Sequence, residues 1–163
     1  MFRIGVGQDR HRLAEGRRFL LGGVAIPFER GEDGHSDGDV LIHAIIDALL
    51  GAASLGDIGE LFPPRDPRYK DADSTLLLRR TAALIRESGW NIVNIDCIVI
   101  CEKPLLLPYR EAICTTIASL LNTPRNTVSV KGKTNEGCDS LGAGEAVEAL
   151  AVCLMTTGTD ISE

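Results

Sequence analysis

The sequence predicts an α+β fold of the α/β sandwich-like kind, in which one mixed β-sheet carries helices on one face. Residues 90–101 read WNIVNIDCIVIC, a run rich in β-branched side chains that is typical of a strand. Residues 39–53 repeat apolar side chains every three or four positions, which indicates a helix. Strand-like and helix-like segments alternate irregularly along 163 residues, a length that suits one compact core. We therefore expect residues 1–163 to form a single domain.

The first half of the chain is expected to hold a strand, a hairpin, a helix and a loop. Residues 2–8 suit a short strand that ends just before Asp9, and residues 17–27 suit a hairpin that turns near Gly22 and Gly23. Acidic residues precede the helix at 39–53, where they suit the positive end of its dipole. Two glycines and three prolines fall within residues 56–70, which predicts a loop there.

The second half is expected to alternate helices and strands. Ser74 is predicted to cap a helix that Gly89 ends, and a further helix is predicted over residues 109–121. Residues 126–134 suit a strand with a polar end. Residues 145–155 leave a choice open. Their alanines and leucine favour a helix, whereas the segment's length and valine spacing fit a buried strand.

Composition excludes several classes of function. The net charge of −6 argues against a surface that grips nucleic acid through its phosphates, so any phosphate ligand is expected to be bound locally. The five cysteines form no CxxC pair and are expected to be reduced thiols. The first residues lack an apolar signal region, and no apolar run reaches the roughly 18 residues of a membrane span. We expect a cytoplasmic protein without nucleic-acid or membrane partners.

Two histidines and a carboxylate are candidates for a metal site. Asp9 and His11 stand two apart at a predicted strand end, so their side chains share one face. Asp39, His43 and Asp47 follow one side of the predicted helix at intervals of four. Asp9, His11 and His43 would leave the fourth position of a zinc-like ion open, as catalytic sites do. Each histidine alone is equally suited to packing in the core, so the pattern does not decide between these uses.

Three further segments are candidates for binding an anion. His35 and Ser36 precede the helix at its positive end, beside glycines that allow a ligand to approach. Asp57 stands between two glycines and suits either a turn or a ribose hydroxyl. Residues 131–137, KGKTNEG, suit a phosphate with a second divalent cation, although a solvated connection explains them as well.

The motifs resemble those of one family over essentially the whole chain. DRH at 9–11, HSDGDVLIHAIIDALLGAASLGDIGELFPPRDP at 35–67, CEKP with LP at 101–108 and KTNEG at 133–137 occur in the order and spacing of the 2-C-methyl-D-erythritol 2,4-cyclodiphosphate synthases. The resemblance implies an enzyme of the non-mevalonate route to isoprenoids (terpenoids), a phosphorus–oxygen lyase. Its substrate is 4-diphosphocytidyl-2-C-methyl-D-erythritol 2-phosphate, whose 2-phosphate attacks the β-phosphate, closes the cyclic diphosphate and releases CMP.

The resemblance also assigns roles to individual positions. It places Zn²⁺ at Asp9, His11 and His43, and Mg²⁺ or Mn²⁺ near Glu136. It gives His35 and Thr134 the stabilisation of the transition state. The full set of implied substrate contacts, which includes several of these residues, is Asp9, Arg10, His11, His35, Ser36, Asp57, Ile58, Gly59, Phe62, Pro63, Pro64, Arg65, Asp66, Cys101, Glu102, Lys103, Pro104, Leu105, Leu106, Leu107, Lys133, Thr134, Asn135 and Glu136.

The resemblance further implies a homotrimer whose sheets pack together and whose active sites lie between subunits, with metal ligands from one chain and the cytidine pocket from the next. It also implies that residues 145–155 form a strand. Two positions depart from the family pattern: Leu105 replaces a common lysine, for which Lys103 is a candidate substitute, and Ala143 replaces a frequent arginine. From the residues alone, a zinc hydrolase and a structural metal in a binding module stay open as alternatives.

Overall fold

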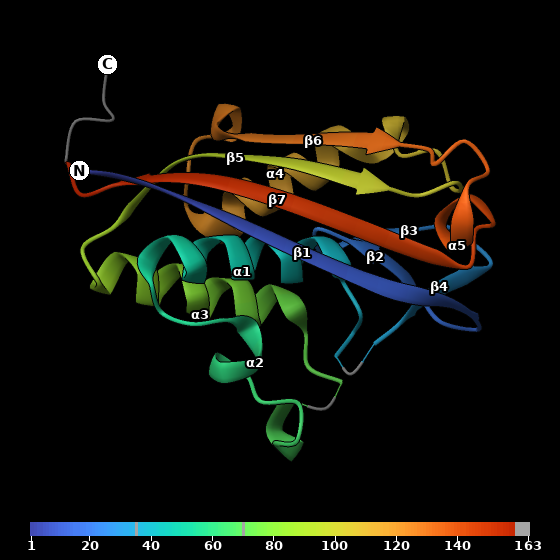
Figure 1. Cartoon of the computed structure of the whole chain (residues 1–163), viewed down its shortest axis with the longest axis horizontal. Coiled ribbons are helices and arrows are strands. Elements are labelled where there is room, and N and C mark those ends of the chain that lie inside the picture. The colour runs from blue at the N-terminus through green and yellow to red at the C-terminus, as the bar shows by residue number, and fades with distance from the viewer. Residues whose placement is uncertain (35, 70, 159–163) are drawn as a thin grey trace.

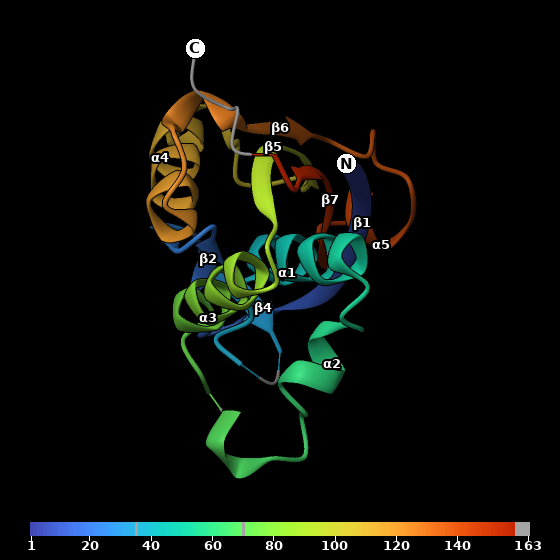
Figure 2. The same cartoon turned by 90° about the vertical axis from the view of Figure 1, so that its left-hand side faces the viewer.

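A five-stranded mixed sheet forms the backbone of the molecule, and its helices lie on one face. The computed structural model describes residues 1–34, 36–69 and 71–158. The strand order is β4-β1-β7-β5-β6, in which β5 and β6 run parallel and the other neighbours run antiparallel. Figures 1 and 2 show α1, α3 and α4 on the same side of this sheet. The predicted α+β class and the helices on one face are therefore confirmed.

The first strand of the sheet is longer than the sequence indicated, and one further strand, β4, was not predicted. They are β1 (Phe2–Glu15), β4 (Arg30–Asp33), β5 (Asn91–Ile100), β6 (Val128–Lys133) and β7 (Ala146–Thr156). The prediction that the first strand ends before Asp9 is wrong, because β7 and β4 pair with β1 beyond that point. Segment 145–155 is a strand, as the family resemblance implied, although its alanines favour a helix.

The hairpin at residues 17–27 is confirmed as β2 (Phe19–Leu21) and β3 (Val24–Ile26). Gly22 and Gly23 form its turn with positive φ angles of 60° and 78°, a conformation that suits a two-residue hairpin. The backbone amides of this turn also face the start of α1, so the hairpin lies against the helix that carries His43.

The helices are α1 (Val40–Ala53), α2 (Ile58–Leu61), α3 (Ser74–Glu87), α4 (Arg110–Leu121) and α5 (Asp139–Gly142), with 3₁₀ turns at Pro67–Tyr69, Leu107–Tyr109 and Arg125–Thr127. The predicted helices at 39–53 and 109–121 are confirmed, but the cap of α3 is Asp73 and not Ser74. Asp73 accepts a hydrogen bond from the amide of Thr75, and Ser74 is the first helical residue. The segment that was predicted as a loop, 56–70, contains the short α2 and the first 3₁₀ turn.

Helix α1 is the centre of the core. Most of its side chains are buried, since the sheet covers one side and α3 another (Figure 2). It crosses β1 at Gly5 and Gly7, where an added Cβ would lie 1.9 Å and 2.0 Å from the carbonyl oxygens of Ala48 and Ala44. Only glycine permits so close an approach of strand and helix backbones. This contact sets the distance between the strand and the helix that carry the candidate metal ligands.

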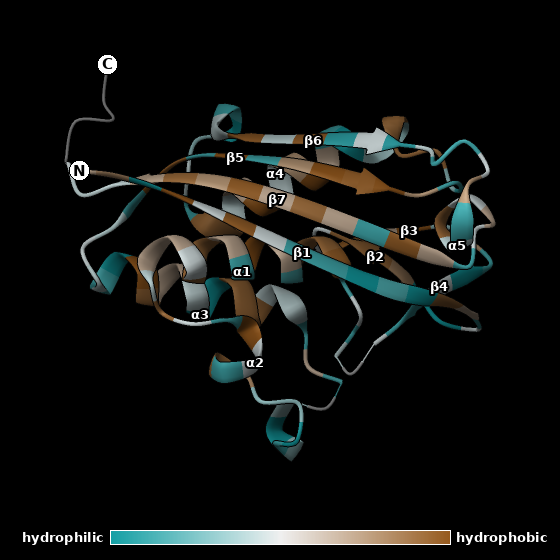
Figure 3. Cartoon of the chain, in the orientation of Figure 1, coloured by the Kyte–Doolittle hydropathy of each residue, from teal (hydrophilic) through white to brown (hydrophobic). Residues whose placement is uncertain are grey.

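No element of the described residues covers the opposite face of the sheet. Even-numbered side chains of β1 project from it, beginning with Phe2, Ile4 and Val6. Figure 3 shows apolar colour along much of β7 and polar colour along the second half of β1. All five cysteines are free thiols, as predicted, and four of them are buried. Among the residues described, no helix has both the length and the apolar character needed to cross a bilayer.

Candidate metal centre and ligand pockets

Strand β1 directs Asp9 and His11 towards α1. The side chains of β1 alternate between the two faces of the sheet, and odd-numbered positions face the helices. The two side chains therefore project in parallel, 27% and 14% exposed for Asp9 and His11. Pairing of β1 with β7 through this region fixes the register and holds both residues on a rigid element.

Helix α1 brings His43 to the same place. Asp39 caps the helix by accepting the amide hydrogen of Ile42, and His43 follows one turn later. Nδ1 of His43 lies 2.9 Å from Oδ2 of Asp9, and Nε2 of His11 lies 3.0 Å from that same oxygen. One ligand atom from each residue lies within 4.8 Å of the other two. The predicted convergence of Asp9, His11 and His43 is therefore confirmed.

The donor set fits a divalent metal of the zinc type. Two imidazole nitrogens and one carboxylate oxygen are the ligands that such ions take in catalytic sites, and three protein ligands leave a position free. Nδ1 of His11 lies 2.6 Å from the carbonyl oxygen of Gly38. Since a carbonyl only accepts, Nδ1 carries the hydrogen and Nε2 is left to face the centre.

The electrostatics of Asp9 and His11 show the same preference for a cation. Burial opposes ionisation of Asp9, but the hydrogen bonds from His11 and His43 outweigh it and hold the pKa of the carboxyl well below its usual range. Burial likewise opposes protonation of His11, but its hydrogen bond to Asp9 and the Asp9 charge outweigh burial and raise its pKa. A positive charge between these groups is therefore stabilised by the surrounding residues.

A cavity of about 220 Å³ opens over the candidate metal centre. The segment after α1 forms its roof, and Oδ1 of Asp47 anchors that segment by accepting the amide hydrogen of Ile58 at 2.7 Å. Arg80 of α3 holds the roof from outside: its Nη1 donates to the hydroxyl of Tyr69 at 3.0 Å, and its guanidinium lies over the ring of Phe62. The cavity lining comprises Asp9, His11, Ser36, His43, Asp47, Ile58, Gly59, Phe62, Pro64, Tyr69 and Leu77.

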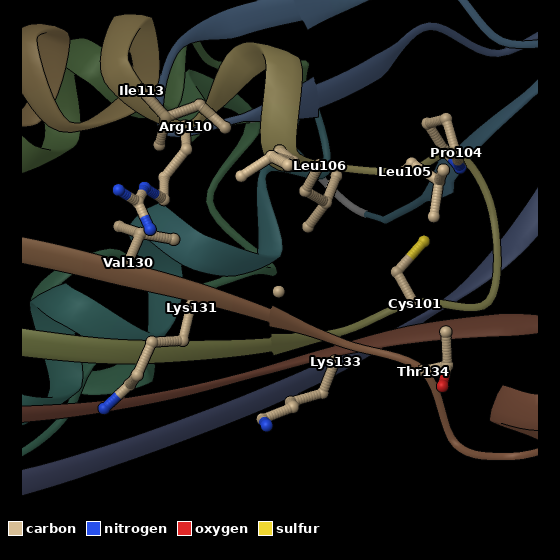
Figure 4. Close-up of a pocket in the computed structure, with 12 residues that line it drawn as sticks. Cys101, Pro104, Leu105, Leu106, Arg110, Ile113, Val130, Lys131, Lys133 and Thr134 are labelled. Atoms are coloured by element: carbon tan, nitrogen blue, oxygen red, sulfur yellow. The ribbon is translucent and has the colours of Figure 1, made fainter.

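A second cavity of about 390 Å³ lies between the end of β6 and the start of α4. In Figure 4, Leu106 and Arg110 enter it from the helix side, and Lys133 and Thr134 from the strand side. Lys131 is paired with Asp96 at 2.5 Å. Within the described residues, Lys133 and Arg110 form no ion pair, so both cations are available to an anionic ligand.

The strand end beside this cavity also carries a carboxylate. The hydroxyl of Thr134 donates to Oε1 of Glu136 at 2.8 Å, and both side chains are exposed. An exposed carboxylate oxygen suits a hard divalent ion such as Mg²⁺ or Mn²⁺. The backbone amide of Asn135 donates to Oε2 of Glu102 at 3.1 Å, and this hydrogen bond fixes the turn that carries Glu136.

Fourteen of the residues predicted to contact substrate line one of the two cavities, seven in each, and the two cavities share no lining residue. Ser36, Ile58, Gly59, Phe62 and Pro64 line the cavity over the metal centre with Asp9 and His11. The second cavity is lined by Cys101, Pro104, Leu105, Leu106, Leu107, Lys133 and Thr134. Lining neither cavity are Arg10, Asp57, Pro63, Arg65, Asp66, Glu102, Lys103, Asn135 and Glu136. His35 lies outside the described residues.

Two predicted residues have structural partners instead. Arg10 projects from the uncovered face of β1, where it pairs with Glu148. Asp57 caps α2 by accepting the amide hydrogen of Glu60 at 2.9 Å. Lys103, the candidate substitute for the lysine that Leu105 replaces, does not line the second cavity, whereas Arg110 does. Arg110 was not predicted, and its place at the start of a helix beside the LP pair of the motif was the only signal.

Comparisons with known proteins agree with this arrangement. The model of the YgbB family matches residues 2–156. A 2-C-methyl-D-erythritol 2,4-cyclodiphosphate synthase from Treponema denticola is 53% identical over 153 residues, 94% of this chain and 95% of the relative. A solved synthase structure in a CDP-bound form superposes with a TM-score of 0.87 at 40% identity, covering 94% of this chain and all of that one.

The bifunctional IspDF protein from Campylobacter jejuni superposes with a TM-score of 0.92 at 39% identity. Its match covers 95% of this chain but only 42% of the bifunctional protein, so this chain is similar to one part of it.

Proposed function

The chain belongs to the YgbB family, whose members matched here are 2-C-methyl-D-erythritol 2,4-cyclodiphosphate synthases, and on this basis we propose that it catalyses the same reaction. The substrate is 4-diphosphocytidyl-2-C-methyl-D-erythritol 2-phosphate. An oxygen of the 2-phosphate forms a bond to the β-phosphorus, the bond from that phosphorus to the bridging oxygen breaks, and CMP leaves with the electron pair. The enzyme is a phosphorus–oxygen lyase of isoprenoid precursor synthesis, formed by residues 1–163 as one domain.

In this reaction the protein positions the two reacting phosphate groups and does not supply the nucleophile. The attacking phosphate belongs to the substrate and is largely dianionic near neutral pH, because its second pKa is about 6. What opposes the reaction is the repulsion between two anionic groups. Holding both in one pocket removes the entropic barrier to their encounter, a contribution that is large for well-oriented groups.

Asp9, His11 and His43 would hold one divalent ion, of the zinc type, and Glu136 would hold a second, Mg²⁺ or Mn²⁺. Such ions withdraw charge from the diphosphate and from the leaving CMP. The hydroxyl of Thr134, which donates its one hydrogen to Glu136 here, would turn to donate it to a phosphate oxygen as charge develops, and Lys133 adds a positive charge beside it. His35, which matches the family motif, is proposed for the same role.

The observation that carries the proposal is the converging set of Asp9, His11 and His43 beneath an open cavity. A structural metal site closes its fourth position with protein, whereas this centre faces about 220 Å³ of space. The implied substrate contacts divide in the same way: the roof residues beside the metal suit the erythritol phosphates, and the second cavity suits cytidine.

The two cavities on one chain are best combined in a homotrimer whose active sites lie between subunits. Because they share no residue, neither alone provides the full set of contacts. The uncovered sheet face supports assembly, since Phe2, Ile4 and Val6 are 69%, 70% and 61% exposed in a row. Contiguous apolar side chains at that exposure are typical of a surface that another protein covers.

Phosphorus NMR with the purified protein, the cytidyl substrate and Mg²⁺ tests the activity. We expect the cyclic diphosphate and CMP to appear together, and a chelator to stop both until metal is restored. CMP without the cyclic product would instead indicate a hydrolase.

A complementation experiment tests the shared site. His43→Ala and Glu136→Ala are each expected to be inactive, yet co-expressed subunits would rebuild some complete sites. Random mixing in equal amounts gives about a quarter of the wild-type activity when the two residues come from different subunits. No recovery in a confirmed mixed trimer would place the whole site within one chain.

A further inference from the structure

A buried chain of hydrogen bonds lies behind His43, on the side of the ring that faces away from Asp9. Nε2 of His43 lies 2.9 Å from the hydroxyl of Ser36 and 3.1 Å from the hydroxyl of Ser74. Ser74, the first residue of α3, is fully buried. Its hydroxyl in turn donates a hydrogen bond to Oδ1 of Asp37. The chain therefore connects the start of α3 to the metal-ligand face of α1.

The chemistry of its members sets the direction of these hydrogen bonds. A carboxylate only accepts, so the hydroxyl of Ser74 is the donor to Asp37. The oxygen of Ser74 then accepts from His43, whose Nε2 must carry the hydrogen. The lone pair of the neutral imidazole is consequently on Nδ1, the nitrogen that lies 2.9 Å from Asp9.

The geometry points to Ser74 and Asp37 as positioning residues that hold His43 as its Nε2–H tautomer and so present Nδ1 to the metal. This inference rests on the proposed metal centre. At many metal-bound histidines a carboxylate accepts the hydrogen of the second ring nitrogen directly and so fixes the orientation of the ring. Here Ser74 would accept that hydrogen, and Asp37 would hold Ser74. His11 is oriented by a backbone carbonyl, that of Gly38, which no substitution removes. His43 depends on side chains, so its orientation can be tested by mutation.

Asp37 also holds the backbone of Ser74 in place. Its Oδ2 accepts the backbone amide hydrogen of Ser74 at 3.0 Å, so the segment before α1 holds the first turn of α3. That backbone bond survives substitution of the Ser74 side chain, and alanine is accepted at the start of a helix. Ser74→Ala is thus expected to fold and to lose only the hydroxyl of residue 74, one of the two that lie against Nε2 of His43.

The experiment measures zinc affinity of the full-length protein by competition with a chromophoric chelator, and the visible spectrum of the Co²⁺-loaded protein. Ser74→Ala is expected to weaken zinc binding roughly 10- to 100-fold, the usual effect of removing an orienting partner. Its Co²⁺ spectrum should also change, because the ring of His43 turns. Ser88→Ala is the control: this hydroxyl lies at the other end of α3 and donates to the carbonyl of Leu84.

Ser74→Thr and Ser74→Val form a second comparison that separates the hydroxyl from packing, because the two side chains have almost the same shape. Zinc binding at least tenfold tighter in the threonine variant would support the inference even if both are less stable than wild type. Equal zinc affinity in folded wild-type and Ser74→Ala proteins, or in the threonine and valine variants, would overturn it. Failure of the wild type itself to bind zinc would instead refute the metal centre and, with it, the proposed mechanism.

Discussion

Adding one methyl group at Gly7 should damage both the fold and the metal centre. The Cβ of an alanine there would lie 2.0 Å from the carbonyl oxygen of Ala44 and 2.6 Å from the amide nitrogen of Ala48. Both are backbone atoms of α1, so no side-chain rotation relieves the overlap. Gly7 precedes Asp9 by two residues on the same face of β1, and Ala44 follows His43 directly. The strain therefore arises beside the metal ligands.

The magnitude follows from these distances. Helix and strand must separate by about 1 Å before the contact becomes one that folded proteins contain, and overpacking of this kind costs up to about 3 kcal/mol. At this chain length each kcal/mol lowers the melting temperature by roughly 2–4 °C, so we expect a loss of about 6–12 °C. Metal ligands tolerate displacements of only about 0.2 Å, so zinc affinity should fall roughly 100-fold.

Gly51→Ala is the matched control, because Gly51 lies on α1, the helix that Gly7 contacts. An added Cβ at Gly51 has no atom within 4 Å, and its φ is not positive. Alanine there should stabilise the helix by about 0.5–1 kcal/mol and leave zinc affinity unchanged. Denaturant unfolding and zinc competition on both variants decide the matter. Wild-type stability and wild-type zinc affinity in Gly7→Ala would refute the argument that this glycine pair sets the spacing of the site.

Two further predictions concern charge and the roof of the cavity. Glu32 is fully buried, and burial together with the charge of Asp39 raises its pKa well above the ordinary value of 4.5. The folded state therefore holds a proton more tightly than the unfolded state, and the free energy of unfolding should fall as pH rises above 4.5. The glutamine of Glu32→Gln cannot titrate. Denaturant unfolding with a chelator present should therefore show that the free energy of unfolding of wild type falls between pH 5 and pH 8 relative to that of the variant. Equal changes in the two proteins would contradict this prediction. Arg80→Met removes the hydrogen bond to Tyr69 and the contact with Phe62, so we expect faster proteolysis of the roof and a higher KM, with global stability within about 0.5 kcal/mol. An unchanged KM would show that Arg80 does not hold the roof during binding.

The sequence predicted well those strands and helices whose apolar side chains follow a long and regular pattern. α1 and β5 carry long apolar patterns, and both are where the sequence places them. β7 was ambiguous because its two faces are both apolar: small side chains such as Ala149 and Ala151 pack on α1, and Leu150 and Val152 face outwards. Alternation is invisible in such a strand, and alanine propensity then favours the wrong answer.

The convergence of the three candidate metal ligands was predictable from local rules, although only the family resemblance favoured a metal site over packing in the core. Asp9 and His11 follow the period of a strand, and His43 follows the turn of a helix. Residues that act across the fold leave no such trace. Asp37 and Ser74 are 37 positions apart, and each alone suits an ordinary helix start. The close approach at Gly7 is likewise visible only once the helix and the strand are in contact.

The centre is arranged for a cation by the same contacts that build the core. Two imidazoles converge on one oxygen of Asp9, and their rings stand edge to face with centroids 5.2 Å apart. Gly38 fixes the hydrogen of one ring, and the serine network fixes that of the other. In the neutral rings both remaining nitrogens would point lone pairs at a carboxylate, which is unfavourable unless a proton or a metal ion supplies a positive charge between them. The rigid strand and helix prevent the rings from turning away, so the fold itself favours a positive charge, a proton or a metal ion, at this point.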